Sequence, residues 1–381
     1  MCGMKKIDNP FIVAGAMPDK YFCDREQETQ WITSMIANGH NLVLISPRRM
    51  GKTSLVRHCY QQPLLADSYH TFYIDILPTT SLAEFTSLLG KQIYDVLLPW
   101  GKKAVDKFIS ALSSLRSCLG YDSLSGLPTL TFSASKIADP VLTLEEIFRY
   151  LAEADKRCVV AIDEFQQISK YPEKNVEALL RSHIQAMSNC NFIFAGSERH
   201  MMMQMFQDSS RPFYNSAMMI DLRAIELDKY VDFIVRNFNE FGKSIDPADA
   251  TGIYEMLEGN TYYIQLLCNA AFMATPKGGA CDKEVIEQAL TRLLEINATF
   301  YRERLSLVPA KQKPLLMAIA KEGVCSGILS SEFIARHSLG TASAVQYAAR
   351  QLVESGIVSL SDDRYSLSDK MLGIWMRRNL M

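Results

Sequence analysis

The chain has 381 residues, of which 48% are hydrophobic and 22% are charged, and its formal net charge is −2. This composition excludes intrinsically disordered, collagen-like and coiled-coil proteins, and the nearly neutral charge excludes a nucleic-acid binder that is basic throughout. At roughly 150 residues per domain, the length predicts two or three domains.

Neither targeting signals nor metal-binding motifs can be found in the sequence. No apolar run approaches the roughly 18 residues of a membrane span. The first lysines, Lys5 and Lys6, are not followed by the apolar stretch that a signal peptide has. The nine cysteines are scattered without a Cys-x-x-Cys pair, which argues against a disulfide framework and a zinc site. We therefore expect a cytoplasmic protein with no membrane partner.

Five short apolar runs predict the strands of a parallel sheet. Leu42–Ile45 and Val159–Ile162 are wholly apolar, as strands buried on both faces are. The other expected strands lie at 71–76, 191–195 and 218–222. Helical patterns separate the runs, among them residues 81–119 and a helix that Thr143 and Glu146 would open as a capping box. Strands that alternate with helices indicate an α/β sheet with helices on both faces.

The remainder of the sequence changes character twice. Residues 227–298 are helical without a strand signal, which predicts a small helical domain. The last part predicts three helices and then a hairpin, which is the order of a winged helix; these elements lie at 311–321, 330–336, 341–354 and 356–367. We expect three domains, namely a core at 1–225, a helical lid at 226–300 and a winged helix at 301–381.

The sharpest motif is the run Ser46-Pro47-Arg48-Arg49-Met50-Gly51-Lys52-Thr53, followed by Ser54. It fits the phosphate-binding pattern G-x-x-x-x-G-K-[ST] except for Ser46 in the first position. Gly51 lets backbone N–H groups approach a phosphate closely, and the helix expected from Lys52 points its positive end at the anion. Lys52 would reach the β- and γ-phosphates, and Thr53 would place a hydroxyl on Mg²⁺. The alternative is an ordinary strand, turn and helix.

Two acidic residues follow the strand expected at 159–162. Asp163 would hold Mg²⁺, and Glu164 would orient or deprotonate the attacking water, which favours hydrolysis over transfer to another acceptor. The alternative is that the two acids cap a strand or helix. Ser197 would bond the γ-phosphate or the water, or cap a helix. Arg199 and Arg211 are candidates for supplying charge to the transition state.

The sequence lacks the Asn-Lys-x-Asp tetrapeptide that reads guanine, so the expected nucleotide is ATP. Several segments also resemble, in this order, the archaeal-type ATPase family of P-loop proteins, which is similar to the STAND signalling ATPases and to replication-initiator ATPases. They are Asp24–Glu26, Ser46–Thr53, Ile162–Gln166, Ala195–Ser197 and Gly259–Tyr263. The resemblance covers roughly residues 7–378. It implies a P-loop sheet of strand order 5-1-4-3-2, with an additional strand between the phosphate-loop strand and the Asp163 strand.

The resemblance also implies roles for individual residues. Lys52 and Thr53 would be the phosphate and Mg²⁺ residues, Asp163 the Mg²⁺ acid and Glu164 the catalytic acid. Ser197 would take the sensor position, and Arg25 and Glu26 would lie near the adenine.

Three departures from the family pattern predict hydrolysis that is slow or dependent on a partner. Ser46 replaces a glycine, the stretch Pro212–Ser216 lacks the arginine that the family often has there, and Asn260-Thr261 replaces Asn-Pro or His-Pro. We therefore expect a Mg²⁺-dependent ATPase of the AAA/STAND-like type that acts as a molecular switch between sheet domain and lid.

The role of the winged helix stays open between duplex DNA, a protein partner and autoinhibition. Residues 301–381 hold 11 Lys and Arg against 7 Asp and Glu, a net of +4. The expected recognition helix offers only Gln346, Arg350 and Gln351 as readers of bases, and Asp362 and Asp363 in the wing would repel phosphates. The weak charge favours a protein contact slightly over a nucleotide-regulated contact with DNA. The oligomeric state is not readable.

Overall fold

The computed structural model describes residues 8–15, 17–100, 102–112, 114, 119–121, 128–130, 135, 137–361 and 363–380. The chain forms two compact units. The sheet unit consists of Arg25–Pro47 and Lys52–Arg223, and the helical unit consists of the segment up to Asp24, Arg48–Gly51 and everything from Ala224 onward. No helix in the described part of the chain combines the length and the apolarity that a bilayer crossing requires.

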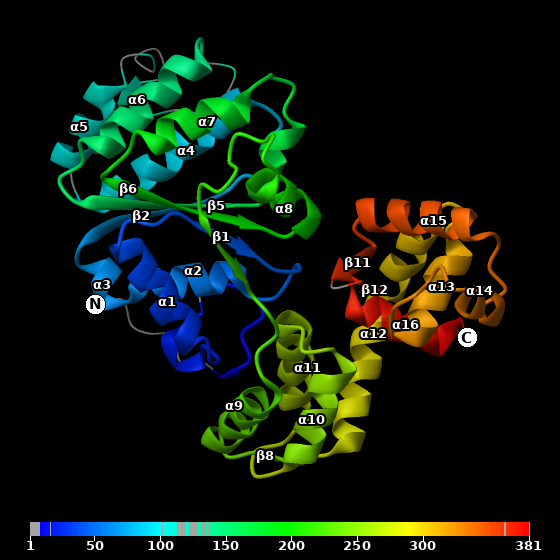
Figure 1. The fold of residues 1–381 in the computed structure, drawn as a ribbon. Coiled ribbons are helices and arrows are strands. Elements are labelled where there is room, and N and C mark those ends of the chain that lie inside the picture. Colours follow the sequence, from blue (N-terminus) through cyan, green and yellow to red (C-terminus); the bar gives the residue numbers. More distant parts are fainter. Residues whose placement is uncertain are drawn as a thin grey trace. The chain divides into compact units, whose positions relative to one another are not determined.

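A five-stranded parallel sheet forms the centre of the sheet unit (Figure 1). Its strands are β1 (Leu42–Ile45), β2 (Tyr69–Asp75), β5 (Arg157–Asp163), β6 (Cys190–Gly196) and β7 (Met218–Asp221). They lie in the order β2-β5-β6-β1-β7, and every neighbouring pair is parallel. Counted among themselves along the chain, these five strands have the order 5-1-4-3-2, with β6 between the phosphate-loop strand and the Asp163 strand. The predicted fold class is confirmed.

Helices cover both faces of this sheet (Figure 1). One face carries α1 (Glu26–Ala37), α2 (Lys52–Gln61) and α3 (Pro63–Ala66), and the other carries α4 (Leu82–Leu97), α5 (Lys102–Ala111), α6 (Pro140–Ala152) and α7 (Val176–Gln185). Successive side chains of a strand point to opposite faces. In β1, Val43 and Ile45 join the core that includes residues of α4 and α6, and Leu42 and Leu44 are buried on the other side. Burial on both sides explains why β1 is a continuous apolar run.

Two local expectations in the sheet unit were wrong. The helix expected over 81–119 is divided by a 3-10 turn at Leu98–Trp100, because Pro99 cannot donate the backbone hydrogen bond that a continuing helix needs. The short strands β3 (Leu119–Tyr121) and β4 (Pro128–Leu130) follow and pair antiparallel.

The expected capping box was wrong as well. Helix α6 starts at Pro140, and its N-cap is Asp139, whose Oδ1 accepts the backbone N–H groups of Val141 and Leu142, each at 3.0 Å. A proline in the first turn of a helix sets its start, because the missing N–H needs no partner there. The hydroxyl of Thr143 donates instead to the Asp139 carbonyl at 2.9 Å, as expected for a threonine inside the helix.

From Leu227 to Ser306 the helical unit contains four helices, which agrees with the helical pattern predicted over 227–298. They are α9 (Leu227–Glu240), α10 (Pro247–Met256), α11 (Thr261–Ala274) and α12 (Lys283–Ser306). The two-residue strands β8 (Ser244–Ile245) and β9 (Ala280–Cys281) pair in parallel between them. This pair was not predicted, because two residues are too few to show an alternation of polar and apolar side chains.

The predicted helices and hairpin of the winged helix follow. They are α13 (Lys313–Glu322), α14 (Ser331–Arg336), α15 (Ala342–Glu354), β11 (Val358–Ser361) and β12 (Arg364–Leu367). A short strand, β10 (Val324–Cys325), completes a sheet of order β10-β12-β11, and α16 (Lys370–Asn379) ends the described chain.

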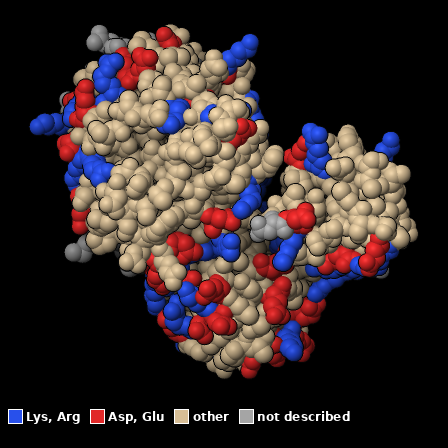
Figure 2. All heavy atoms as spheres, in the orientation of Figure 1, with Lys and Arg blue, Asp and Glu red and all other residues tan. Residues whose placement is uncertain are grey.

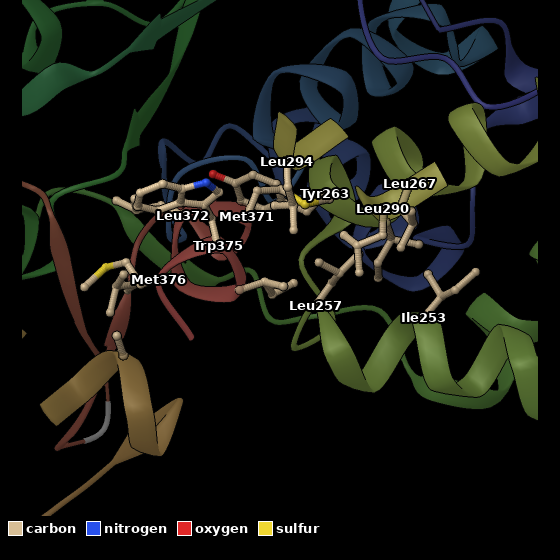
Figure 3. Close-up of a cluster of buried hydrophobic side chains, with 14 of the residues drawn as sticks. Ile253, Leu257, Tyr263, Leu267, Leu290, Leu294, Met371, Leu372, Trp375 and Met376 are labelled. Carbon is tan, nitrogen blue, oxygen red and sulfur yellow. The ribbon is translucent and has the colours of Figure 1, made fainter. Parts of the chain in front are cut away.

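One continuous hydrophobic core runs through the lid helices and the winged helix (Figure 3). Side chains of α10, α11 and α12 meet those of α16, among which Trp375 is 4% exposed and lies 5.8 Å from the ring of Tyr301. Polar contacts cross the same boundary, since Arg304 pairs with Asp369 at 3.3 Å and Lys370 with Glu258 at 2.5 Å. Lid and winged helix therefore pack as one body.

Candidate active site

The phosphate-binding motif forms the turn between β1 and α2. Gly51 has a φ of +91° and Arg49 a φ of +71°, so two residues of the turn lie in the left-handed region that glycine adopts without strain. Ser46 is fully buried, and the Lys52 ammonium lies 3.4 Å from its carbonyl oxygen, to which it donates. Helix α2 begins at Lys52, so its first N–H groups are available to an anion at this end.

The other residues of the motif differ in exposure. Pro47, Arg48 and Arg49 are exposed, Met50 is buried, and Ser54 is half-buried in the first turn of α2. The motif, predicted to be one binding element, is divided between the two units, because Arg48–Gly51 group with the helical unit.

The two expected Mg²⁺ residues meet at the carboxyl edge of the sheet. Thr53, in the first turn of α2, donates its hydroxyl to Oδ2 of Asp163 at 3.1 Å. Asp163 ends β5 and is 6% exposed. A hydroxyl and a carboxylate are the hard oxygen ligands that Mg²⁺ takes, so this pair fits that ion. Tyr73 of β2 joins them, because its hydroxyl contacts both the Asp163 carboxylate and the Thr53 hydroxyl.

Glu164 is held by two side chains from other segments. Its Oε2 accepts a hydrogen bond from the Ser197 hydroxyl at 2.7 Å and another from Nε2 of Gln166 at 2.6 Å. Its backbone has a φ of +56°, and its N–H donates to Oδ1 of Asp163 at 3.0 Å. The predicted residues Asp163, Glu164 and Ser197 thus form one connected cluster.

A third acid, which the sequence analysis missed, lies at the same edge. Asp75 ends β2 and is paired in register with Asp163. Burial raises the pKa of the Asp75 carboxyl, a hydrogen bond from the Leu77 N–H opposes this, and the charges of Asp163 and Glu164 raise it again. The rule that carboxyl ends of parallel strands share an edge could have found Asp75.

The three arginines singled out from the sequence are engaged in ion pairs. Arg25 is 5% exposed and donates to the Glu28 carboxylate and the Arg223 carbonyl, each at 2.5 Å. It therefore ties the start of α1 to the segment after β7. Two further ion pairs join Arg199 to Asp221 at 2.6 Å and Arg211 to Glu177.

Within the helical unit, Arg49 contacts the start of α11. Its guanidinium donates to the Tyr263 hydroxyl at 2.5 Å and stacks over the ring of Tyr262, whose centroid lies 4.5 Å away. The backbone N–H of Tyr262 donates to the Arg49 carbonyl at 3.1 Å. Asn260, the N-cap of α11, donates to the Arg48 carbonyl at 3.5 Å. The altered Asn260-Thr261 pair therefore lies where a lid helix meets the motif.

Comparison with known proteins agrees with this geometry. Residues 22–267 match the model of an ATPase domain family predominantly from Archaea, and residues 299–378 match that of a probable winged helix domain. The chain belongs to this archaeal ATPase family. An uncharacterized ATP-binding protein of Methanocaldococcus jannaschii is 28% identical over 160 residues, which are 39% of this chain and 43% of that protein. The chain thus matches less than half the length of this relative.

Solved structures of other proteins share the fold. A Walker-type ATPase of Pyrococcus abyssi matches with a TM-score of 0.66 and 18% identity, over 97% of this chain and 99% of that one. The ORC2 protein of Aeropyrum pernix, solved with ADPNP and ADP, matches with a TM-score of 0.59 and 12% identity, over 97% and 98%. The succession of a sheet, lid helices and a winged helix is therefore shared along nearly the whole chain.

Proposed function

We propose that this member of the archaeal ATPase family hydrolyses ATP with Mg²⁺ and acts as a molecular switch. The observation that carries the proposal is the Thr53 hydroxyl, 3.1 Å from the Asp163 carboxylate, with Lys52 and Glu164 as their neighbours in sequence. The family match supports ATP as the nucleotide.

Each residue of the cluster would have a distinct task. Lys52 and the first N–H groups of α2 would bind phosphate oxygens. Thr53 and Asp163 would hold Mg²⁺, which would neutralise phosphate charge when bound. Glu164 would accept the proton of the attacking water. We assign this proton to Oε1, because Ser197 and Gln166 both donate to Oε2.

Two features bear on turnover and on the adenine. Arg199 and Arg211 are each paired with an acid, which supports hydrolysis that depends on a partner for further positive charge. Arg25 would affect adenine binding through the backbone that it fixes, since its guanidinium is engaged by Glu28 and the Arg223 carbonyl.

The proposed switch rests on the contacts of Arg49. The phosphate-binding motif contains Arg49, and Arg49 is bonded through both side chain and backbone to Tyr263 and Tyr262 of α11. A phosphate that draws the N–H groups of the motif toward itself would therefore act on the lid helix. Nucleotide exchange would change the position of the lid by this route.

The test compares wild type with Lys52→Ala and Glu164→Gln in ATP binding and Mg²⁺-dependent hydrolysis. We expect Lys52→Ala to abolish binding, and Glu164→Gln to keep binding but lower the rate by about 10²- to 10⁴-fold, the usual contribution of a general base. Glu153→Gln, an exposed acid after α6, is the matched control and should leave both unchanged. Unaltered ATP binding by Lys52→Ala, or unaltered turnover by Glu164→Gln, would contradict the proposal.

For the winged helix we propose a protein partner, with duplex DNA as the alternative. On α15, Tyr347 is 67% exposed, and Arg350 and Gln351 both bond to Glu354, at 2.7 and 2.9 Å. The visible face of the winged helix is mostly uncharged (Figure 2). An Aeropyrum pernix ORC1 protein, solved in complex with DNA, shares the fold at 14% identity and a TM-score of 0.50, which is why DNA is kept as the alternative.

These two roles differ in their response to salt. A contact with DNA phosphates weakens steeply between 50 and 200 mM salt, because counterions are released on binding. We expect no such salt-dependent binding to a duplex and no stimulation of hydrolysis by DNA. Tight duplex binding that falls steeply with salt would establish the alternative.

A further inference from the structure

Tyr73 lies at the candidate Mg²⁺ site, and neither the sequence motifs nor the proposed reaction provide a role for it. It lies on β2 opposite Ala161 of β5, two residues before Asp75 and Asp163, which are paired in the same register. Phe72 and Ile74 belong to the core on the α4 face, so alternation directs Tyr73 to the α2 face. The small side chain of Ala161 leaves room for the ring to extend toward the carboxyl edge.

Helix α2 holds the ring and the hydroxyl from the other side. Arg57 and Thr53 are four residues apart on α2 and therefore share one face of the helix. The Arg57 guanidinium lies over the Tyr73 ring, 5.2 Å from its centroid, and the Thr53 hydroxyl is 3.1 Å from the Tyr73 hydroxyl. Tyr73 is thus fixed at its ring and at its oxygen.

Three oxygen atoms meet at this point. The Tyr73 O–H donates to Oδ2 of Asp163, and the Thr53 hydroxyl lies 3.1 Å from that same oxygen. A tyrosine hydroxyl has one proton, and Tyr73 uses it in the hydrogen bond to Asp163. This hydrogen bond orients the carboxylate toward Thr53 and leaves the hydrogen bond from Thr53 to Asp163 in place. The Thr53 lone pairs remain for an incoming ion, and so does one lone pair of Oδ1 of Asp163, which otherwise accepts the Glu164 N–H at 3.0 Å.

We propose that Tyr73 is a positioning residue for Mg²⁺, which holds Asp163 in the orientation that the ion and its water shell require. The proposal rests on the function proposed above. It adds a residue that determines the concentration of Mg²⁺ required for nucleotide binding. Groups that hydrogen-bond to a metal ligand orient it, and their loss typically lowers metal affinity 10- to 100-fold. Tyr73 would act on ATP through the metal alone.

The test measures binding of a fluorescent, slowly hydrolysed ATP analogue as Mg²⁺ is raised from zero. We expect Tyr73→Phe, which keeps the ring beneath Arg57, to raise the Mg²⁺ concentration for half-maximal binding by about 10-fold or more. Binding of the analogue in EDTA should be unchanged. This separation of metal affinity from nucleotide affinity is what a merely structural tyrosine would not produce.

Tyr60→Phe is the matched control. Tyr60 lies in α2, as Thr53 and Arg57 do. Its hydroxyl donates to the backbone carbonyl of Phe72 at 3.0 Å, and Phe72 is the residue before Tyr73. It should leave the Mg²⁺ requirement of wild type unchanged, and circular dichroism shows whether each variant is folded.

The possible results distinguish a failure of the role of Tyr73 from a failure of the proposed function. An unchanged or lowered Mg²⁺ requirement in Tyr73→Phe would overturn the role of Tyr73, and so would an equal shift in Tyr60→Phe. Failure of wild type to bind the analogue, or binding that Lys52→Ala does not reduce, would overturn the proposed function itself.

Discussion

At the scale of single residues, the position of the Glu164 carboxylate depends on Gly196, through the side chain of Gln166. Gly196 ends β6, and a Cβ there would lie 2.5 Å from Cγ and Sδ of Met202 and 2.6 Å from Oε1 of Gln166. Both neighbours are buried, so neither can move freely. The absence of a side chain at Gly196 lets Gln166 approach closely enough to donate to Glu164.

Substitution of Gly196 by alanine should therefore destabilise the protein and slow ATP hydrolysis. We expect Gly196→Ala to lower the free energy of unfolding by about 1–3 kcal/mol, the usual effect of overpacking a core, and to lower the hydrolysis rate by displacing Gln166. Urea unfolding and steady-state hydrolysis measure the two effects.

Gly252→Ala is the control for this substitution. Gly252 lies in α10 with nothing within 4 Å of a Cβ, so alanine should stabilise that helix by about 1 kcal/mol. If Gly196→Ala were as stable as wild type, the close contacts at Gly196 would not constrain Gln166.

At the scale of secondary-structure elements, helix starts depend on which of two competing signals takes effect. For α6 the sequence contains two possible start signals. One is Asp139-Pro140, and the other is the later pair Thr143 and Glu146. The structure uses Asp139 as the cap, and the Glu146 carboxylate instead accepts the Ser114 hydroxyl at 2.5 Å. Tertiary contact with Ser114 thus removes Glu146 from any capping role.

This choice predicts the effect of removing the cap. Asp139→Ala should lower the free energy of unfolding by about 1 kcal/mol, because two backbone N–H groups of the first turn lose their acceptor. Asp139→Asn keeps a side-chain oxygen and should retain most of the stability. Urea unfolding distinguishes them, and equal stability of wild type and Asp139→Ala would show that the cap contributes nothing.

The same scale shows how far sequence patterns predict this protein. The strands β1 and β5 were predictable because burial on both faces leaves no polar residue inside them, and the phosphate motif was predictable because Gly51 and Lys52 are required by chemistry at fixed spacing. Tyr73 was not predictable, since its place at the site follows from the register of β2 on β5. Asp75 could have been expected at the carboxyl edge, because it lies near the end of a predicted strand. No pattern within one segment contains that register.

At the scale of the whole molecule, α16 joins the winged helix to the lid. Trp375 is 4% exposed, and around it lie residues of α12 and of its own helix (Figure 3). The predicted domain boundary between residues 300 and 301 lies inside α12, which continues to Ser306. A core that crosses the boundary makes the two parts unfold together.

Trp375→Ala tests this shared core. We expect a loss of about 3–5 kcal/mol in the free energy of unfolding of the helical unit, as for other buried aromatic residues. Hydrogen exchange should accelerate in α11 as well as in α15. Arg302→Ala, which removes a cation 6.0 Å from the Trp375 ring while leaving the core intact, is the milder control. Acceleration confined to α13–α15 would show that the lid is stable without the winged helix.

The length of α12 has a mechanical consequence. A continuous helix of 24 residues is about 36 Å long. If its first turn tilts by about 10°, its last turn moves by about 6 Å, with no bond in the helix broken. The winged helix packs on α12 and would move by this distance if nucleotide binding tilted the helix as proposed. The helix would thus act as a lever, and its gain would be set by its length.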